Sequence, residues 1–278
     1  MTNSEWPMVV AHRGASLDRA EHTLAAYELA LRQGADGLEC DVRLTRDGQL
    51  VCVHDRRVDR TSDGHGVVSA RTLASLSTFD YGGWHDEPLR SADELVRVRR
   101  AKPSAARDRR GLLTLDGLLG LVRDTAPDTT LFVETKHPVR YAGLVEVRLV
   151  AALARHGLAR PARRRESRIV VMSFSSAAMR RIREHAPMLP TVLLMGRVPR
   201  ERRDGSLPPW ADIAGPGIDL LRDDPGYVKR ARGYGHGVYS WTVDDPGDVD
   251  YCRDLGVRYL ATNVPADARA RLGNATGE

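Results

Sequence analysis

Two pairs of charged residues are spaced two positions apart within apolar runs. Glu39 and Asp41 lie in GLECDV, and Glu134 and Lys136 lie in TLFVETK. Side chains two positions apart in a β-strand point to the same side, so each pair shares one face. Three buried carboxylates repel one another unless a cation neutralises them, and Mg²⁺ and Ca²⁺ bind such oxygen ligands. The pattern predicts a divalent-cation site formed by Glu39, Asp41 and Glu134, with a salt-bridged core as the alternative.

Two histidines also follow apolar runs, His12 after MVVA and His54 after LVCV. Imidazole is available in both protonation states near neutral pH, so a pair beside an acidic cluster is suited to proton transfer. Arg13 can bind a phosphate or carboxylate through its planar guanidinium, and Lys136 suits a neighbouring anion. Gly14 would let the backbone approach a ligand. The alternatives are structural histidines and a rim salt bridge at Arg13.

These residues lie in short apolar segments that read as strands. The eight candidates are 8–12, 37–42, 50–55, 130–136, 168–174, 190–195, 237–243 and 258–263. Helical stretches fall at 22–34, 114–125, 141–157 and 175–187, the first with Thr23 as its N-cap. Such alternation indicates parallel strands, and eight of them in 278 residues predict a closed (β/α)8 TIM barrel. A ninth segment, 212–218, is ambiguous and could displace one of the eight.

In a barrel of this kind, active sites form at the C-terminal ends of the strands, where all of these charged residues fall. Only 12 residues separate Asp41 from His54, and they include an Asp-Gly turn, so we expect an extended return without a helix. Residues 56–113 hold no strong strand or barrel helix and are predicted to be an insertion after the third strand. We therefore expect a single domain, 1–278, with this insertion leaving from the catalytic rim.

We expect the apolar first part of the insertion, including Trp84, to fold over the pocket, while the basic stretch 97–110 stays on the surface. The net charge of +5 and a second basic run at 163–165 raise the question of nucleic acid. Acidic residues number 37, aromatics make up 5%, and no nucleic-acid motif is present, so we expect no nucleic-acid partner.

The sequence also bears on the compartment. It has no apolar run of about 18 residues and no signal-peptide pattern, so we expect no stable membrane association. The three cysteines, at positions 40, 52 and 252, lack metal-type spacing and suit reduced thiols, which predicts a cytoplasmic location. The sequence does not determine an oligomeric state.

The motifs resemble those of the glycerophosphodiester phosphodiesterases, which are related to phosphatidylinositol-specific phospholipases C. The match keeps the family's order and is carried by AHRGAS at 11–16, EHT at 21–23, GLECDVRLTRDGQLVCVHD at 37–55, VETK at 133–136, SF at 173–174 and YSWTVDD at 239–245. The resemblance implies a barrel that uses one divalent cation, Mg²⁺ or Ca²⁺, to hydrolyse a small glycerophosphodiester to glycerol 3-phosphate and an alcohol. It places the chain in lipid and glycerol metabolism.

Carried over by motif, the resemblance implies a role for each residue: His12 and His54 as the acid/base pair, Glu39, Asp41 and Glu134 as metal ligands, and Arg13 and Lys136 as phosphate contacts. Glu21 is expected to orient these groups, although an acid at a helix start is the alternative. Trp241 is expected to wall the alcohol pocket, with a core position as the alternative.

The chain departs from the family pattern at two positions. His22 stands where the family usually has Asn, and Asn263 stands where Asp is frequent. Two other functions remain open: a lysophospholipase D or sphingomyelinase D-like phosphodiesterase, and a non-catalytic barrel that binds a phosphorylated ligand and regulates a partner. The second would be expected to lack a histidine or an acid of the core set, and none is lacking.

Overall fold

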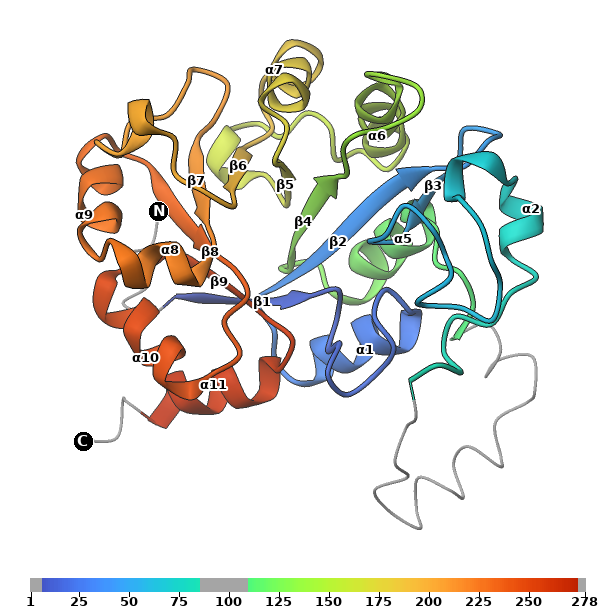
Figure 1. Ribbon diagram of the computed structural model, residues 1–278, viewed down its shortest axis with the longest axis horizontal. Helices are drawn as coiled ribbons and strands as arrows, with labels where there is room; N and C mark the ends of the chain where they lie inside the picture. Colours follow the sequence, from blue (N-terminus) through green and yellow to red (C-terminus); the bar gives the residue numbers. More distant parts are fainter. Residues whose placement is uncertain (1–6, 86–109, 275–278) are drawn as a thin grey trace.

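The computed structural model describes residues 7–85 and 110–274. Eight strands form the central sheet: β1 Met8–His12, β2 Gly37–Leu44, β4 Thr130–Thr135, β5 Ile169–Ser173, β6 Thr191–Met195, β7 Ile213–Pro216, β8 Gly237–Ser240 and β9 Tyr259–Thr262. They pair in parallel in the order β1-β9-β8-β7-β6-β5-β4-β2, and β1 pairs again with β2. The sheet therefore closes into the (β/α)8 barrel that the sequence predicts (Figure 1).

Helices surround the strands (Figure 1). The α-helices outside the insertion are α1 Leu24–Arg32, α5 Leu115–Thr125, α6 Leu144–Arg155, α7 Ser176–His185, α8 Ile218–Asp223, α9 Gly226–Gly233, α10 Pro246–Leu255 and α11 Pro265–Asn274. Two short 3₁₀ helices lie in loops, η2 Arg164–Glu166 and η3 Arg200–Arg202. The four predicted helices are confirmed, and Thr23 caps α1 by accepting a hydrogen bond from the Ala26 amide.

Alternation along the strands divides the barrel interior into an apolar floor and a charged top. Val10 precedes His12 by two residues, and Phe132 precedes Glu134 by two, so each pair points inward. Phe132 packs against Tyr239 and Tyr259, with ring centroids 5.3 and 5.1 Å apart. The apolar layer excludes water from below, so the charged residues meet only at the C-terminal ends of the strands.

The prediction that residues 50–55 form a barrel strand is wrong. Only β3, Leu50–Cys52, is extended there, and it pairs antiparallel with β2. The Asp47–Gly48 turn, with Gly48 at φ +76°, reverses the chain too early for a crossover helix. The eighth barrel strand is β7, which lies in the ambiguous segment 212–218. The expected extended return between Asp41 and His54 is confirmed.

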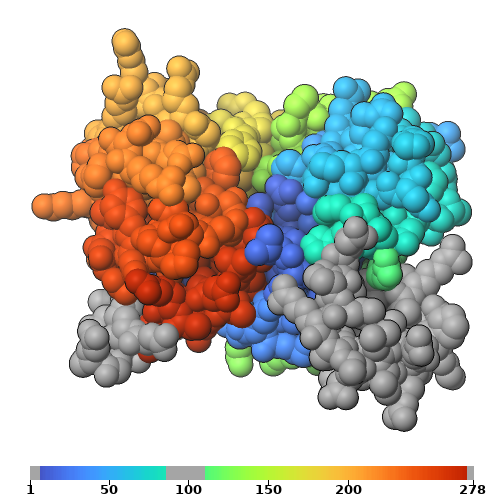
Figure 2. All heavy atoms as spheres, turned by 60° about the horizontal axis from the view of Figure 1, so that its bottom comes forward, coloured from blue at the N-terminus to red at the C-terminus, as the bar shows by residue number. Residues whose placement is uncertain are grey.

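The insertion follows β3 and carries η1 Val68–Ala70 and α2 Leu73–Leu76. Its buried residues form a small core with the strand, namely Val51, Val53, Val58, Val68, Leu76 and Tyr81. Figure 2 shows dark-blue residues of the N-terminal segment reaching the surface between the cyan insertion and the orange and red C-terminal third. Most of the predicted basic stretch, residues 97–109, lies outside the described residues.

Among the helices in the described part of the chain, none has the length and apolar character needed to span a bilayer.

Candidate active site

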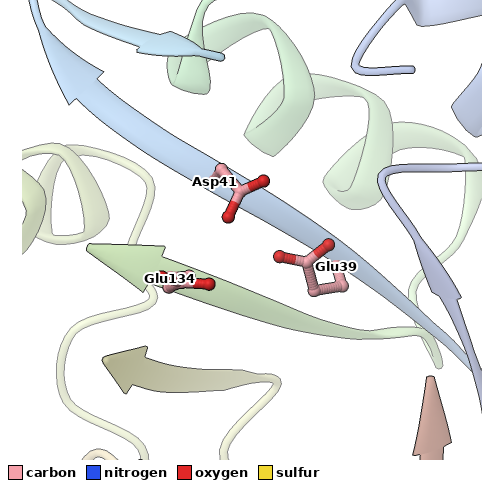
Figure 3. A group of neighbouring side chains, drawn as sticks. All are labelled: Glu39, Asp41 and Glu134. Atoms are coloured by element: carbon pink, nitrogen blue, oxygen red, sulfur yellow. The ribbon is translucent and has the colours of Figure 1, made fainter. Parts of the chain in front are cut away.

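The three predicted carboxylates converge at the top of the barrel. Glu39 and Asp41 project from β2, and Glu134 projects from the neighbouring β4, where it is in register with Asp41 (Figure 3). One oxygen of each lies within 4.8 Å of the others, and all three side chains are buried. The shared strand face that the sequence indicates is therefore present.

Burial and mutual repulsion make this cluster costly when it is charged. Burial and the charge of Asp41 raise the pKa of Glu39 well above its usual range and raise the pKa of Glu134 to about 8. Burial acts on Asp41 in the same direction, but His22 and Lys136 hold its pKa well below its usual range. A hard divalent cation relieves such repulsion through carboxylate oxygens, so this donor set fits Mg²⁺ or Ca²⁺.

The two predicted anion-binding residues lie against the same carboxylates. Lys136 Nζ is 2.9 Å from Glu134 Oε1 and 3.3 Å from Asp41 Oδ1. Arg13 Nε lies 3.2 Å from Asp41 Oδ2 but forms no hydrogen bond, so this buried donor still has capacity for an acceptor. Both side chains also line a cavity above the cluster, where a phosphate could reach them.

His12 is oriented by a network that joins the two ends of the chain. Asn263 donates from Nδ2 to Asp244 Oδ2 at 2.6 Å, which leaves its Oδ1 to accept from Ser16 Oγ at 2.7 Å and from His12 Nδ1 at 2.9 Å. His12 Nδ1 therefore carries the hydrogen, and Nε2 of the neutral ring is free to accept a proton. Burial and the neighbouring Arg13 lower the pKa of His12 to about 4, so the ring is neutral at pH 7.

His54 reaches the site from the antiparallel return and not from the end of a barrel strand. The Val53 amide donates to the Asp41 carbonyl at 3.0 Å, so the return brings His54 back down to the level of the acidic cluster. His54 Nδ1 donates to Asp55 Oδ1 at 2.8 Å, and Arg60 Nε holds the other oxygen of Asp55 at 2.6 Å. Burial, Arg13 and Lys136 lower the pKa of His54, while Asp41 and the hydrogen bond to Asp55 act in the opposite direction.

Glu21 links the surroundings of the two histidines. It accepts hydrogen bonds from Arg13 Nη1 at 3.2 Å and from both terminal nitrogens of Arg60 at 2.8 Å. Burial raises its pKa, but the Arg60 hydrogen bonds and nearby positive charges outweigh that effect and lower it to about 2. The chain of contacts runs Arg13–Glu21–Arg60–Asp55–His54. Glu21 thus holds one end of the Arg13 guanidinium beside the acidic cluster.

The open space above the cluster measures about 130 Å³. Its charged walls are the two histidines, Arg13, Glu39, Glu134 and Lys136, and its other walls are Met172, Phe174, Leu194, Tyr239, Trp241 and Thr242. Asp41 stands behind them, surrounded by Arg13, His22 and Lys136. Trp241 packs edge-to-face against Phe174 and donates to the Gly215 carbonyl at 2.8 Å. One side of the space is therefore charged and the other apolar.

Two expectations, those for Trp84 and Gly14, change at this point. Trp84 donates to the Tyr81 carbonyl at 2.9 Å and does not line the cavity. Gly14 also lies outside the lining; at φ +83° it faces α1, where a Cβ would come within 2.7 Å of the Ala26 backbone. Its role is close packing of the strand against the helix. His22 touches the site directly, through Nε2 at 2.9 Å from Asp41 Oδ2.

The chain is also similar to known proteins. The family model of the glycerophosphoryl diester phosphodiesterase family matches residues 12–267, which is most of the chain and includes every residue described above. The chain belongs to the glycerophosphoryl diester phosphodiesterase family. This membership confirms the family and the enzyme class predicted from the sequence motifs.

Similar proteins cover nearly all of the chain. A Mycobacterium tuberculosis protein named "Probable glycerophosphodiester phosphodiesterase 1" is 51% identical over 98% of this chain and 95% of its own length. The glycerophosphodiester phosphodiesterase of Bacillus subtilis is 31% identical over 93% of this chain and 84% of its own. Among solved structures, an Oleispira antarctica phosphodiesterase in complex with sn-glycerol-3-phosphate shares the fold, with a TM-score of 0.78, 22% identity and coverage of 97% and 98%.

Sequence reasoning missed several residues that orient the site. Asp244 and Ser16 hold Asn263 against His12, and Arg60 binds Glu21 and Asp55. Asp244 lies inside the YSWTVDD motif and Ser16 inside AHRGAS, so the motifs contained both without revealing their partners. Arg60 lies in no such motif, and its contact with Glu21 spans 39 positions.

Proposed function

We propose that this chain hydrolyses small glycerophosphodiesters to glycerol 3-phosphate and an alcohol, with one Mg²⁺ or Ca²⁺ held by Glu39, Asp41 and Glu134. The observation that carries the proposal is the arrangement of the two histidines. Each ring is fixed through Nδ1, and both line one space above three buried carboxylates. Family membership supports the substrate class.

A divalent cation held by Glu39, Asp41 and Glu134 would supply positive charge that stabilises the charge developing around phosphorus. Arg13 and Lys136 contribute hydrogen bonds to the same phosphate. Arg13 is suited to this because Glu21 fixes one end of its guanidinium while Nε keeps an unused donor. The basic side chains thereby position the phosphate between the two histidines.

We assign the general base to His12 and the general acid to His54. Nε2 of neutral His12 accepts the proton of the attacking hydroxyl, from water or from glycerol C2, as the new oxygen–phosphorus bond forms. His54, whose ring Asp55 orients through Nδ1, donates a proton to the alcohol oxygen as its bond to phosphorus breaks. If the 2-hydroxyl attacks, water then opens the cyclic phosphate. The products are glycerol 3-phosphate and the free alcohol.

The test measures glycerol 3-phosphate released from glycerophosphocholine by the full chain, with Mg²⁺, with Ca²⁺ and with a chelator. We expect product with at least one cation and none with the chelator. Release of choline phosphate in place of glycerol 3-phosphate would contradict the assigned cleavage. Binding of a phosphorylated ligand without product under any condition would favour the regulatory barrel.

We further propose that residues 1–278 form a single domain with its insertion at 56–113. The family match, which runs through the insertion, supports this, as does the small core that Val51 of β3 shares with Leu76 of α2. The cytoplasmic location stays part of the proposal, and the three buried cysteines without a disulfide are consistent with it.

A further inference from the structure

A second and larger cavity lies on the same end of the barrel and is lined by arginines. It measures about 460 Å³, a volume typical of small-molecule sites. Its charged lining residues are Arg43, Arg56 and Arg140, and its other lining residues are Leu44, Val67, Val68, Ser69, Ala70, Pro138, Val139 and Tyr141. Among the described residues that line it, none is acidic. Three positive charges around one concave space make it attractive to anions.

The three guanidinium groups have few close partners among the residues that the structure describes, although Asp41, Glu134 and Asp55 attract Arg43 from beyond ion-pair distance. Arg43 donates from Nε to the His54 carbonyl at 3.0 Å, and Arg140 stacks over the Tyr141 ring at 5.5 Å. None of the three forms an ion pair with a described carboxylate, whereas the nearby Asp55 is already bound to Arg60 and His54. Unpaired guanidinium groups retain the planar donor pairs that match phosphate and carboxylate oxygens.

The fold places this cavity next to the catalytic one. Arg43 lies two residues beyond Asp41 on β2, and Pro138 lies two residues beyond Lys136 after β4. The insertion closes the far wall, where Tyr141 donates to the Ser69 carbonyl at 3.4 Å. Arg43 also links this cavity to His54, because its Nε donates to the His54 backbone carbonyl.

We propose that this arginine cavity binds a second anionic group, a phosphate or a carboxylate, on the alcohol half of the substrate. The inference rests on the proposed function, in which His54 protonates the leaving alcohol. The alcohol half then lies on the His54 side of the phosphorus, which is the side of the arginine cavity. Glycerophosphodiesters whose alcohol carries an anion are the preferred substrates of this chain.

Two pairs of substrates isolate the extra anion. Glycerophosphoserine differs from glycerophosphoethanolamine by one carboxylate, and bis(glycerophospho)glycerol differs from glycerophosphoglycerol by a second phosphodiester. The measured quantity is the ratio of kcat/KM within each pair. We expect the wild-type ratio to favour the anionic member in at least one pair, which also identifies the group that is bound.

The variant Arg56→Gln/Arg140→Gln tests the cavity itself, because neither residue contacts the catalytic groups. We expect it to lower the favourable ratio about three- to tenfold, the effect of losing two charge-assisted contacts at a partly exposed site. Arg165→Gln is the matched control, since Arg165 is exposed in η2 before β5, at the opposite end of the barrel. Thermal melting checks that each variant is folded.

The inference is overturned if the wild-type ratios do not favour the anionic member, or if Arg165→Gln lowers them as much as the double variant does. Failure of the proposed function looks different, because the wild-type chain would then hydrolyse none of the four esters. In that case, calorimetric titration with bis(glycerophospho)glycerol and glycerophosphoglycerol still tests whether the arginine cavity binds a second anionic group. Tighter binding of the first, lost in the double variant, supports the arginine cavity, and equal binding removes it.

Discussion

At the scale of single residues, the site depends on buried acids balanced by basic neighbours. Asp41 is in contact with Arg13, His22 and Lys136, while Glu39 accepts the Arg13 backbone amide at 3.0 Å. Each of these contacts lowers the cost of a negative charge away from water. A divalent cation adds to that balance, so the carboxylate oxygens are the groups on which cation affinity depends.

Replacing Glu39 by Gln tests the cation site with little change in side-chain volume. We expect affinity for Mg²⁺ and Ca²⁺, measured by calorimetry, to fall by at least about 100-fold, because a neutral amide is a weaker ligand for a hard cation. Hydrolysis should be lost in parallel. Glu184→Gln, on the exposed face of α7, is the control. Unchanged cation binding in Glu39→Gln would remove this residue from the site.

The roles of the two histidines can be distinguished by how the rate of each alanine variant depends on the leaving group. His12→Ala and His54→Ala should each lower kcat about 10²–10⁴-fold on glycerophosphocholine, the usual effect of losing a general acid or base. A p-nitrophenyl ester of glycerol phosphate needs little protonation, so it should restore much of the rate of His54→Ala but not of His12→Ala. His185→Ala, at the exposed end of α7, serves as the control. Equal losses with both esters would contradict the division of roles.

At the scale of elements, a buried acid fixes the loop that follows Lys136. Glu146, in the first turn of α6, accepts hydrogen bonds from His137 Nε2 at 2.7 Å and from Arg181 Nε of α7 at 3.0 Å. These contacts join the end of β4 to two helices. The same loop continues into Pro138–Tyr141, which line the arginine cavity, so one carboxylate supports both sites.

Glu146→Gln is expected to destabilise the fold by about 3 kcal/mol, because it leaves Arg181 and His137 facing a neutral amide in a buried setting. Urea unfolding at neutral pH measures this change in the free energy of unfolding. Glu184→Gln should be close to wild type. A change as small as that of the control would show that the buried contact is not needed for stability.

The stabilising effect of Glu146 should depend on pH in one direction. Burial raises its pKa, but hydrogen bonds from His137 and Arg181 outweigh burial and hold the pKa below its usual range. Such a group stabilises the fold above its unfolded pKa of about 4.3 and loses this effect as the pH falls through the folded pKa. The difference between wild type and Glu146→Gln should therefore shrink below about pH 4. A constant difference down to pH 3 would contradict this expectation.

At the scale of the whole molecule, the proposed cation site would couple cation binding to folding. The three acidic ligands come from β2 and β4, and these strands are held in register only in the closed barrel. A cation held by this proposed site would therefore bind the folded chain and not the unfolded one, and at about 100 times its Kd it would add about 2.7 kcal/mol of stability.

Thermal melting measures this coupling without any substrate. We expect saturating Mg²⁺ or Ca²⁺ to raise the Tm of the wild-type chain by several degrees relative to a chelator. The same addition should leave the Tm of Glu39→Gln nearly unchanged. If neither cation moves the wild-type Tm, the acidic cluster is a salt-bridged core, as the alternative interpretation of the sequence has it.

The sequence by itself determined the features that depend on short-range periodicity. The spacing of Glu39 with Asp41, and of Glu134 with Lys136, places each pair on one strand face because side chains alternate along any strand. The order of apolar and amphipathic segments indicated parallel strands with covering helices, and the motifs identified the family. These conclusions depend only on residues close together in the chain, and the structure agrees with them.

The tertiary structure decided the features that depend on distant segments. The sequence did not show that residues 50–52 turn back on β2 while 213–216 complete the barrel, because 50–52 is the more strand-like of the two segments and 213–216 ends in Gly215 and Pro216. The hydrogen bond between His12 and Asn263 spans 251 positions, and the arginine cavity combines side chains from β2, the insertion and the loop after β4. Closure of the barrel brings these groups together, and no local pattern records which distant residues will meet.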